Sequence, residues 1–346
     1  MICREEEVAV VSMKDIAEKC GVSVATVSKA LSGQKDISAE TVTRIKEMAA
    51  ELGYQTNAAA RALRTNRSYN IGVLFFDEGH SGLTHNYFSA VLESVRTEAE
   101  KSGYDITFIS ANVGRRAATY LQHCRYRNVD GVIIACVDFR DPMVIELADS
   151  DIPLVSIDHV FNNCTAIVSD NMDGMTELTR KVIEAGHRNI AVIHGENTSV
   201  TQNRLRGFFR ECEQHGISIR EDRLKSSAYR NPEGCAQIVK ELLKEEDRVT
   251  CIMFPDDYSA IGGIYAIRES GLRIPEDISV VGYDGIEIAQ VLEPKITTWK
   301  QDTDELGKLA VRKLTALIER PRTTIPETVM VKGRFLEGTS LGSPKK

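Results

Sequence analysis

The feature that most constrains this chain is a repeated alternation of apolar runs and amphipathic segments, which begins at Asn70. Apolar runs such as "NIGVLFF", "VDGVIIAC" and "ISVVGYD" are separated by helical patterns such as "YFSAVLESVRTEAEKSGY". Strands that are apolar almost without interruption are typical of parallel sheets covered by helices on both faces. Seven or more such units exceed one compact sheet. The sequence therefore predicts an α/β core of two doubly wound parallel-sheet subdomains in tandem.

The segment before this core predicts a small all-α domain of three short helices. Ser12, Ser23 and Ser38 are suited to cap these helices, and Gly21 is suited to end the first. Two helices joined by a tight turn that contains glycine form a helix-turn-helix pattern. The second helix is expected to bury one face, made of Val22, Val27, Ala30 and Leu31.

The opposite face of this second helix carries small hydroxyls and one cation, namely Ser23, Thr26, Ser28 and Lys29. In a helix-turn-helix the second helix lies in the major groove, with its N-terminal residues on base edges. Ser23 and Thr26 are sized for phosphate contacts, and Lys29 has the reach and charge for guanine O6 and N7. Val24 and Ala25 are suited to thymine methyl groups. The alternative is an ordinary three-helix bundle with a solvated face.

A short basic segment, "NAAARALRTNRS", follows the helical domain. Asn57 is a fair N-cap, but about eight residues do not form a stable helix alone in water. Arg61, Arg64 and Arg67 indicate that DNA orders the segment, and Leu63 has the shape of a wedge for a minor-groove base step. The alternative is a linker that contains arginine.

Charge is distributed unevenly along the chain. Residues 13–67 contain nine Lys or Arg and six Asp or Glu, so their net charge is +3. The whole chain has a net charge of −7, and the remaining residues therefore carry −10. A basic N-terminal segment on an otherwise acidic chain favours binding of that segment to the phosphates of nucleic acid. The N-terminus has no apolar signal region, no run is long enough to cross a membrane, and the eight cysteines form no CxxC pair. These features predict a cytoplasmic protein with reduced thiols and no membrane partner.

Motifs of common enzyme chemistry do not occur in this sequence. It contains no GxGxxG after a strand, no GxxxxGK[ST] loop, no HExxH and no GxSxG. The seven histidines do not cluster, and His187 at a helix-to-strand turn favours a structural role. We therefore expect no catalytic activity, no cofactor and no metal site.

Several motifs, taken together, resemble the bacterial transcription regulators of the lactose-repressor/galactose-repressor (LacI/GalR) family. They are "KDIAEKCGVSVATVSKALSG", "ISAETVTRIKEMAAELGYQTNAAARALRTNRS", "IGVLF", "VDGVIIA", "AGHRNIAVIHG", "RLRGF" and "PEDISVVGYDGIEIAQVLEPKITTWKQD". They stand in family order from about Met13 to Leu336. The head motif is highly specific, and several later motifs are independent of it.

The resemblance implies a domain organisation. It places a helix-turn-helix domain at 12–56, a hinge helix and linker at 57–67, and an effector-binding and dimerisation core of periplasmic-binding-protein type at 68–340. The N-subdomain is expected at about 68–167 and 298–325, and the C-subdomain at about 168–297 and 326–340. Family members bind pseudopalindromic double-stranded DNA operators as homodimers and hold a small effector between the two subdomains.

Functional positions also follow from the resemblance. It places base reading at Val24, Ala25 and Lys29, supporting contacts at Thr26 and Ser28, and minor-groove insertion at Leu63. In the cleft it implies effector contacts for Phe76, Tyr87, Phe88, Asp158, Arg204, Tyr229, Asp256 and Asp284. Independently, Asp158 and Asp284 end apolar strands, where doubly wound sheets bind ligands. The alternatives are that these acids cap turns and that Tyr87 and Phe88 belong to the core.

This sequence departs from the family pattern at three places. Thr56 stands where a proline often precedes the hinge asparagine, which makes the hinge entry less rigid. Asp256 replaces an amide, so we expect the effector to offer an extra donor or a positive charge there. No leucine-rich segment follows Leu341, so a C-terminal tetramerisation helix is not expected.

The sequence thus predicts a DNA-binding transcription regulator, expected to be a repressor, whose operator affinity is controlled by a small metabolite. Sugar, sugar phosphate, purine and amino acid all stay open as effectors, with a sugar or sugar derivative favoured. Whether the effector releases or tightens DNA binding also stays open. The alternative functions are a solute-binding protein with a helical appendage and a hydrolase on a doubly wound sheet.

Overall fold

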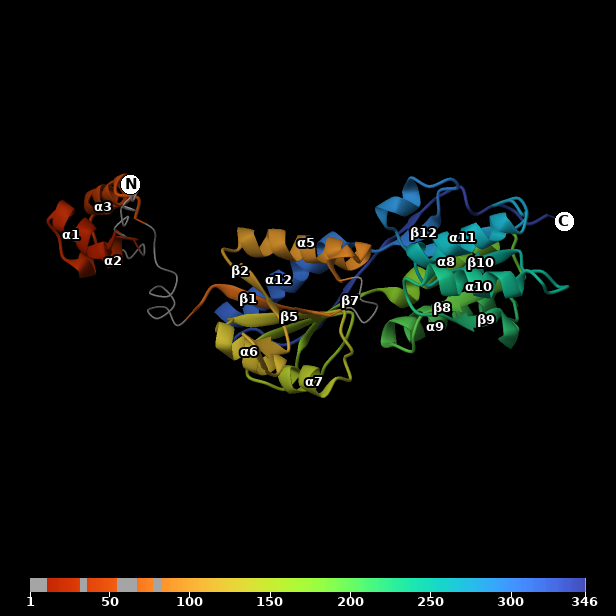
Figure 1. Cartoon of the computed structure of the whole chain (residues 1–346), viewed down its shortest axis with the longest axis horizontal. Coiled ribbons are helices and arrows are strands. Elements are labelled where there is room, and N and C mark those ends of the chain that lie inside the picture. The colour runs from red at the N-terminus through yellow and green to blue at the C-terminus, as the bar shows by residue number, and fades with distance from the viewer. Residues whose placement is uncertain (1–10, 32–35, 55–66, 77–81, 346) are drawn as a thin grey trace, which may run out of the picture. The chain divides into compact units, whose positions relative to one another are not determined.

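The computed structural model describes residues 11–31, 36–54, 67–76 and 82–345. The chain divides into two compact units at Ser68. In the part of the first unit that the structure describes there are three helices (Figure 1), α1 (Met13–Cys20), α2 (Val24–Leu31) and α3 (Ala39–Glu51). These are the three helices that the sequence predicts.

The ends of these helices are fixed by short side chains. Ser12 donates its backbone N–H to the Asp15 carboxylate over 2.8 Å, and Gly21 ends α1 in the left-handed conformation, with φ 63°. The Ser23 and Ser38 hydroxyls accept from the backbone N–H three residues later, at 3.0 and 3.3 Å. The predicted caps of α2 and α3 are therefore confirmed.

A small apolar cluster holds the three helices together. Ile16, Val27, Ala30 and Ile45 are fully buried in it, and Val22 and Leu31 pack against it. The predicted inner face of α2 is therefore confirmed.

The second unit contains two six-stranded sheets. The first sheet has the order β13-β7-β6-β5-β1-β2, and the second has the order β14-β12-β11-β10-β8-β9. All pairings in these two sheets are parallel except that of β14 with β12. The strands of the first sheet are β1 (Asn70–Phe75), β2 (Asp105–Ile109), β5 (Gly131–Ala135), β6 (Leu154–Ile157), β7 (Thr165–Ser169) and β13 (Thr328–Val331). Those of the second are β8 (Ile190–His194), β9 (Leu224–Ser226), β10 (Cys251–Met253), β11 (Ser279–Asp284), β12 (Thr297–Lys300) and β14 (Arg334–Leu336).

Helices cover both faces of each sheet (Figure 1). In the N-subdomain, α5 (Asn86–Lys101) and α12 (Thr303–Glu319) lie on one face, and α6 (Tyr120–Arg127) and α7 (Pro142–Ala148) lie on the other. In the C-subdomain, α8 (Asn171–Glu184) and α9 (Ser199–Gln214) pack together, as do α10 (Pro232–Leu242) and α11 (Asp257–Glu269). The remaining elements are the hairpin β3 (Asn112–Val113) and β4 (Arg116–Ala117) and the 3₁₀ helices η1 (Gly82–Thr84), η2 (Glu221–Arg223) and η3 (Glu287–Gln290).

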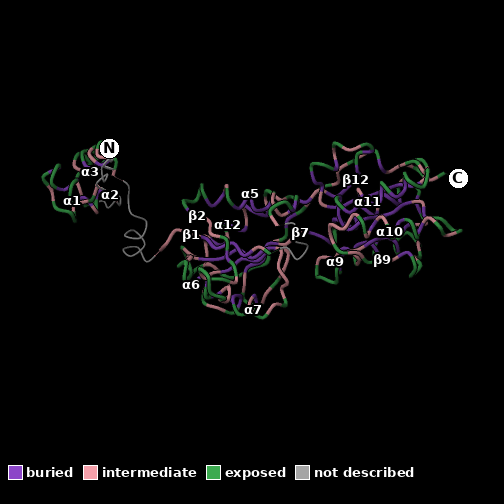
Figure 2. The backbone as a smooth tube through the Cα atoms, in the orientation of Figure 1, coloured by how far each residue is buried: buried purple, intermediate pink, exposed green. Residues whose placement is uncertain are grey.

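The central strands β1, β5, β6, β10 and β11 are buried between these helix layers (Figure 2), which explains their continuous apolar sequences. In β1, Ile71 and Val73 join the core under α5 and α12, while Leu74 joins the core under α6 and α7. Successive side chains of a strand point to opposite faces, so each strand serves two cores.

The chain passes between the subdomains at places that differ from the predicted boundaries. β13 pairs with β7 in the first sheet, so the prediction that all of 326–340 belongs to the C-subdomain is wrong for this strand. β12 pairs with β11, so residues 298–300 belong to the second sheet rather than to the first. An apolar run does not reveal which sheet it joins, because strand partners are far apart in sequence. Within the described residues no helix is long and apolar enough to cross a membrane.

Candidate DNA-binding and effector sites

The outer face of α2 carries the residues predicted to meet DNA. Ser23, Val24, Ala25 and Lys29 are exposed, and Thr26 and Ser28 are half-buried. The Ser23 hydroxyl lies 2.8 Å from the Thr26 hydroxyl, so the two hydroxyls are held side by side at the start of the helix. This placement suits a helix whose first turn approaches a groove.

Lys29 forms an ion pair with an acid that follows the helix. Its Nζ lies 2.5 Å from Asp36 Oδ2, and about half of each side chain is exposed, 48% for Lys29 and 53% for Asp36. The hydrogen bond from Lys29 holds the pKa of Asp36 below its usual value. The ammonium group of Lys29 is therefore held by a carboxylate in this structure, and its predicted contact with a base stays a prediction.

The predicted hinge contacts, Asn57, Arg61, Leu63 and Arg64, lie outside the described residues. They stay predictions.

In the core, two acids lie at the C-terminal ends of buried strands, as the sequence predicts. Asp284 is the last residue of β11, and Asp158 directly follows β6. Both have left-handed backbones, with φ 98° and 58°. Non-glycine residues adopt this conformation mainly where the surroundings enforce it, often at functional sites.

Asp158 is oriented by two hydrogen bonds. Its Oδ1 accepts from the backbone N–H of Ser169 over 2.7 Å, and its Oδ2 accepts from the Tyr87 hydroxyl over 2.9 Å. Burial, and then the Asp158 charge, raise the pKa of Tyr87 well above its usual value. Tyr87 therefore stays a protonated donor, and the remaining lone pairs of Asp158 can accept from a ligand.

Asp284 lies between an amide and a guanidinium. Its Oδ1 accepts from Gln301 Nε2 over 2.6 Å and lies 3.6 Å from Arg204 Nη2. Burial raises the pKa of Asp284 to about 6, although Arg204 opposes this shift. Asp284 therefore changes its charge just below neutral pH.

Arg204, on α9, is buried and held from several sides. Its Nε donates to Asn171 Oδ1 and its Nη1 to the Pro255 carbonyl oxygen, both over 2.8 Å. The 3.6 Å between Nη2 and Asp284 is too long for a direct hydrogen bond. An oxygen of a ligand could therefore accept from Nη2 in this arrangement.

Two tyrosine rings flank this guanidinium. The Arg204 guanidinium carbon lies 3.6 Å from the ring centroid of Tyr283 and 5.8 Å from that of Tyr229. Tyr229 is fixed by a 2.8 Å hydrogen bond between its hydroxyl and that of Thr201. Its ring also requires glycine at 195, because a Cβ there would lie 2.1 Å from the ring. The structure thus brings Tyr229 to Arg204, as predicted.

Asp256 is held in place by donors of the protein. It caps α11, because its Oδ1 accepts from the Ser259 N–H over 2.7 Å. Its Oδ2 accepts from the Ser259 hydroxyl at 2.9 Å and from the Arg230 N–H at 2.8 Å. Protein donors therefore occupy three of the about four lone-pair sites of this carboxylate, and its predicted contact with the effector stays a prediction.

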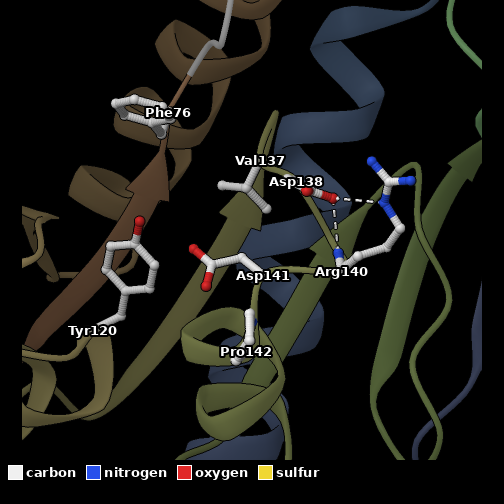
Figure 3. A pocket seen from close by; sticks show the side chains of 7 residues that line it. All are labelled: Phe76, Tyr120, Val137, Asp138, Arg140, Asp141 and Pro142. Carbon is white, nitrogen blue, oxygen red and sulfur yellow. Dashed lines mark hydrogen bonds and ion pairs between the residues drawn. The ribbon is translucent and has the colours of Figure 1, made fainter.

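The two predicted phenylalanines belong to the N-subdomain, Phe76 just after β1 and Phe88 in α5. Phe88 packs against the rings of Phe75 and Tyr87 beside the apolar core of the N-subdomain. Phe76 follows β1, is 53% exposed, and faces Tyr120 across a pocket of about 370 Å³ (Figure 3). The rest of that pocket comes from the segment after β5 and the start of α7, namely Val137, Asp138, Arg140, Asp141 and Pro142.

A separate narrow pocket is lined by both subdomains. The N-subdomain contributes His85, Asn86 and Tyr87, and the C-subdomain contributes Arg230, Asp256, Tyr258, Asp284 and Ile286. This pocket joins the predicted residues Tyr87, Asp256 and Asp284 across the two sheets. Its volume is about 10 Å³, so in this arrangement the cleft is closed around its own side chains, and the placement of these residues rather than an open cavity marks the candidate small-molecule site.

Sequence reasoning missed four residues of this region, Ser169, Asn171, Tyr283 and Gln301. Gln301 directly follows β12, and Ser169 and Asn171 flank the end of β7, so a search of all strand ends would have found three of them. Tyr283 gave no such signal, because its contact with Arg204 depends on packing.

Comparisons with known proteins agree with this arrangement. Residues 12–57 match the family described as bacterial regulatory proteins, lacI family, and residues 179–341 match a periplasmic binding protein-like domain. The chain is 34% identical to a ribose operon repressor of Haemophilus influenzae, over 92% of this chain and 97% of that protein.

Solved structures show the same fold. A lac repressor dimer bound to operator and an anti-inducer is 26% identical, with a TM-score of 0.80 over 96% of this chain and 99% of that one. A LacI family regulator from Enterococcus faecium with bound ribose is 26% identical, with a TM-score of 0.69 over 80% of this chain and 100% of that one.

The helix-turn-helix domain, the two-sheet core and the relatives together define a ligand-controlled, DNA-binding transcriptional repressor, which is a regulator rather than an enzyme. The expected class is therefore confirmed, and the solute-binding and hydrolase alternatives are not supported. The chain belongs to the lacI family of bacterial regulatory proteins.

Proposed function

We propose that this repressor binds a pseudopalindromic operator as a homodimer in the cytoplasm and that a neutral sugar bound in the core cleft controls its operator affinity. The observation that carries the effector assignment is the buried group of Arg204, Asp284 and Tyr229. It combines a donor, an acceptor and an aromatic face, which are the partners that hydroxyl groups and the C–H face of a sugar require.

The charge balance of the cleft favours a neutral ligand. Asp158, Asp256 and Asp284 lie in or beside it, against Arg204 and Arg230. A phosphate would add negative charge to a site where carboxylates are already in excess, at a cost that grows with burial. Hydroxyl groups both donate and accept, so they match the acids and the arginines without adding charge.

Ribose is the first candidate. The relative from Haemophilus influenzae is a ribose operon repressor, and the regulator from Enterococcus faecium was solved with bound ribose. Both support a pentose in the same cleft of this chain.

Dimerisation through the C-subdomain is supported by exposed apolar side chains on neighbouring elements. Tyr265 of α11 is 69% exposed, Ile288 of η3 is 42% exposed, and Val291 just after η3 is 74% exposed. α11 and η3 contact each other, and apolar side chains exposed on adjoining elements suit an interaction surface. The lac repressor that shares this fold was solved as a dimer on its operator.

A thermal-shift screen tests the effector class. D-ribose, D-glucose, D-ribose 5-phosphate and adenine are added separately to the full chain. A ligand present at about a hundred times its dissociation constant stabilises the folded state by about 2.7 kcal/mol. We expect a neutral sugar to raise the melting temperature and the phosphate to have no effect. A shift with phosphate or adenine alone would contradict the proposal. Operator binding with and without the sugar then shows the direction of control.

A further inference from the structure

Arg230, which no motif singled out, occupies a constrained position in the loop between β9 and α10. Its backbone is left-handed, with φ 53°, which is unfavourable for a residue with a side chain. The backbone N–H donates to Asp256 Oδ2 over 2.8 Å, and this bond holds the conformation.

The carboxylate at 256 is what makes this support possible. Its two oxygens accept three hydrogen bonds, two from Ser259 and one from Arg230. An amide has one acceptor oxygen, and its nitrogen only donates. An asparagine could therefore not accept at both positions, so the acid at 256 and the placement of Arg230 belong together.

The guanidinium of Arg230 is fixed between the two subdomains. Its carbon lies 4.7 Å from the ring centroid of Tyr258, and Nη2 donates a long hydrogen bond of 3.5 Å to the carbonyl oxygen of Thr84 in the N-subdomain. Nη1 is buried and has no hydrogen-bond partner among the described residues. A buried donor without an acceptor is costly, and native proteins satisfy nearly all of them.

We propose that Arg230 is a specificity-determining residue of the effector cleft, which donates through Nη1 to an oxygen of the bound effector while Nη2 holds the Thr84 carbonyl. This inference rests on the proposed function, because it requires that an effector widens the narrow pocket, about 10 Å³ in this structure, that Arg230 lines with Asn86 and Asp284. One side chain then joins the effector to both walls of the cleft.

The arrangement restricts the effector chemically. The end of the molecule beside Arg230 must present an acceptor oxygen, such as a hydroxyl or ring oxygen. A methyl or ammonium group there would leave Nη1 buried without an acceptor. Lysine does not replace arginine in this role, because one ammonium nitrogen does not donate in two fixed directions as the guanidinium does.

The test uses the full chain with the variants Arg230→Lys and Arg230→Asn, and with Arg206→Lys as the control. Asparagine tolerates a left-handed backbone, so Arg230→Asn keeps the loop conformation if lysine disturbs it. Arg206 lies exposed on α9 and pairs only locally, with Asn203. Calorimetric titration with D-ribose gives the affinity, and hydrogen exchange of residues 84–88 without ligand reports on the Thr84 contact.

We expect both Arg230 variants to bind D-ribose about tenfold or more weakly, because a hydrogen bond from a charged group is lost. Exchange in 84–88 should become faster in both variants, and the control should match wild type in both measurements. Unchanged D-ribose affinity would overturn the effector contact, and unchanged exchange would overturn the bond to Thr84. If D-ribose does not bind wild-type protein, the ribose assignment fails, and the exchange measurement still decides whether Arg230 joins the two walls.

Discussion

The guanidinium carbon of Arg204 lies over the ring of Tyr283, 3.6 Å from its centroid, although the two residues are on different elements of the C-subdomain. The contact leaves the edge of the guanidinium to meet Asn171, Pro255 and Asp284. Cation–π contact with a desolvated ring is worth about 2 kcal/mol or more. Tyr283 therefore fixes the plane in which Arg204 can donate to an effector.

Removing this arginine should uncouple the effector from DNA. We expect Arg204→Ala to abolish the response of operator binding to the effector and to leave operator binding itself in place, since coupled sites are linked but separate. Operator affinity is measured with and without sugar by fluorescence anisotropy.

Truncation of a buried ion pair can destabilise the fold by about 3–5 kcal/mol, so Arg204→Lys is measured beside it. Lysine keeps the positive charge but lacks the two guanidinium N–H groups that donate to Asn171 and Pro255. Arg206→Ala serves as the control. A wild-type response of Arg204→Ala at the same sugar concentration would show that the effector binds elsewhere.

Effector binding should depend on pH through Asp284. The pKa of this acid is raised to about 6, and a hydroxyl of the effector donates best to the ionised form. Affinity should therefore rise as pH increases from 5 to 7 and level off above, with at most about a tenfold change per pH unit below pH 6. Titrations at several pH values check this, and Asp284→Asn should flatten the profile. A pH-independent affinity in wild type would exclude Asp284 as an acceptor.

The same pKa predicts an opposite trend for the stability of the ligand-free core. The folded-state pKa lies above the usual value of 3.8, so burial disfavours the ionised form. The contribution of Asp284 to stability is complete below about pH 3.8 and is lost as pH rises through about 6. Urea denaturation of wild type and Asp284→Asn between pH 4 and 7.5 should therefore converge toward low pH. If the difference in unfolding free energy between wild type and Asp284→Asn grew toward low pH instead, it would contradict a raised pKa of Asp284.

Lys29 should determine sequence preference on DNA. If it reads a guanine, Lys29→Ala should cost about 1–3 kcal/mol on the operator and much less on random DNA. Competition binding at fixed salt measures both, with Lys46→Ala, an exposed lysine of α3, as the control. Equal losses on both DNAs would indicate that Lys29 meets only phosphate.

Leu63, in the predicted hinge, should increase the bend of the bound DNA. We expect Leu63→Ala to weaken operator binding about tenfold and to reduce the bend of the DNA, because a wedge that opens a base step is removed. Thr65→Ala is the matched control. Effector affinity and thermal stability should stay at wild-type values. An unchanged operator affinity together with an unchanged bend angle would remove the minor-groove proposal.

The sequence by itself determined the elements that depend on near neighbours. Ser23 and Ser38 cap their helices because a cap needs only a hydroxyl and a backbone N–H three residues later, and Ser12 donates its backbone N–H to Asp15 at the same spacing. The buried strands followed from their uninterrupted apolar runs. The positions of Asp158 and Asp284 followed as well, because parallel strands in one sheet end at the same edge.

Only the tertiary structure decided which distant residues meet. Asn171 and Tyr283 converge on Arg204 from positions 33 residues before it and about 80 after it, and β13 joins the first sheet rather than the second. The sequence pattern at Asp256 suggested an acceptor for the effector, and only the packing shows that this carboxylate also accepts from Arg230 and Ser259. Periodicity and capping are local properties of a chain, whereas partners across sheets depend on how whole layers pack, and no short pattern encodes that.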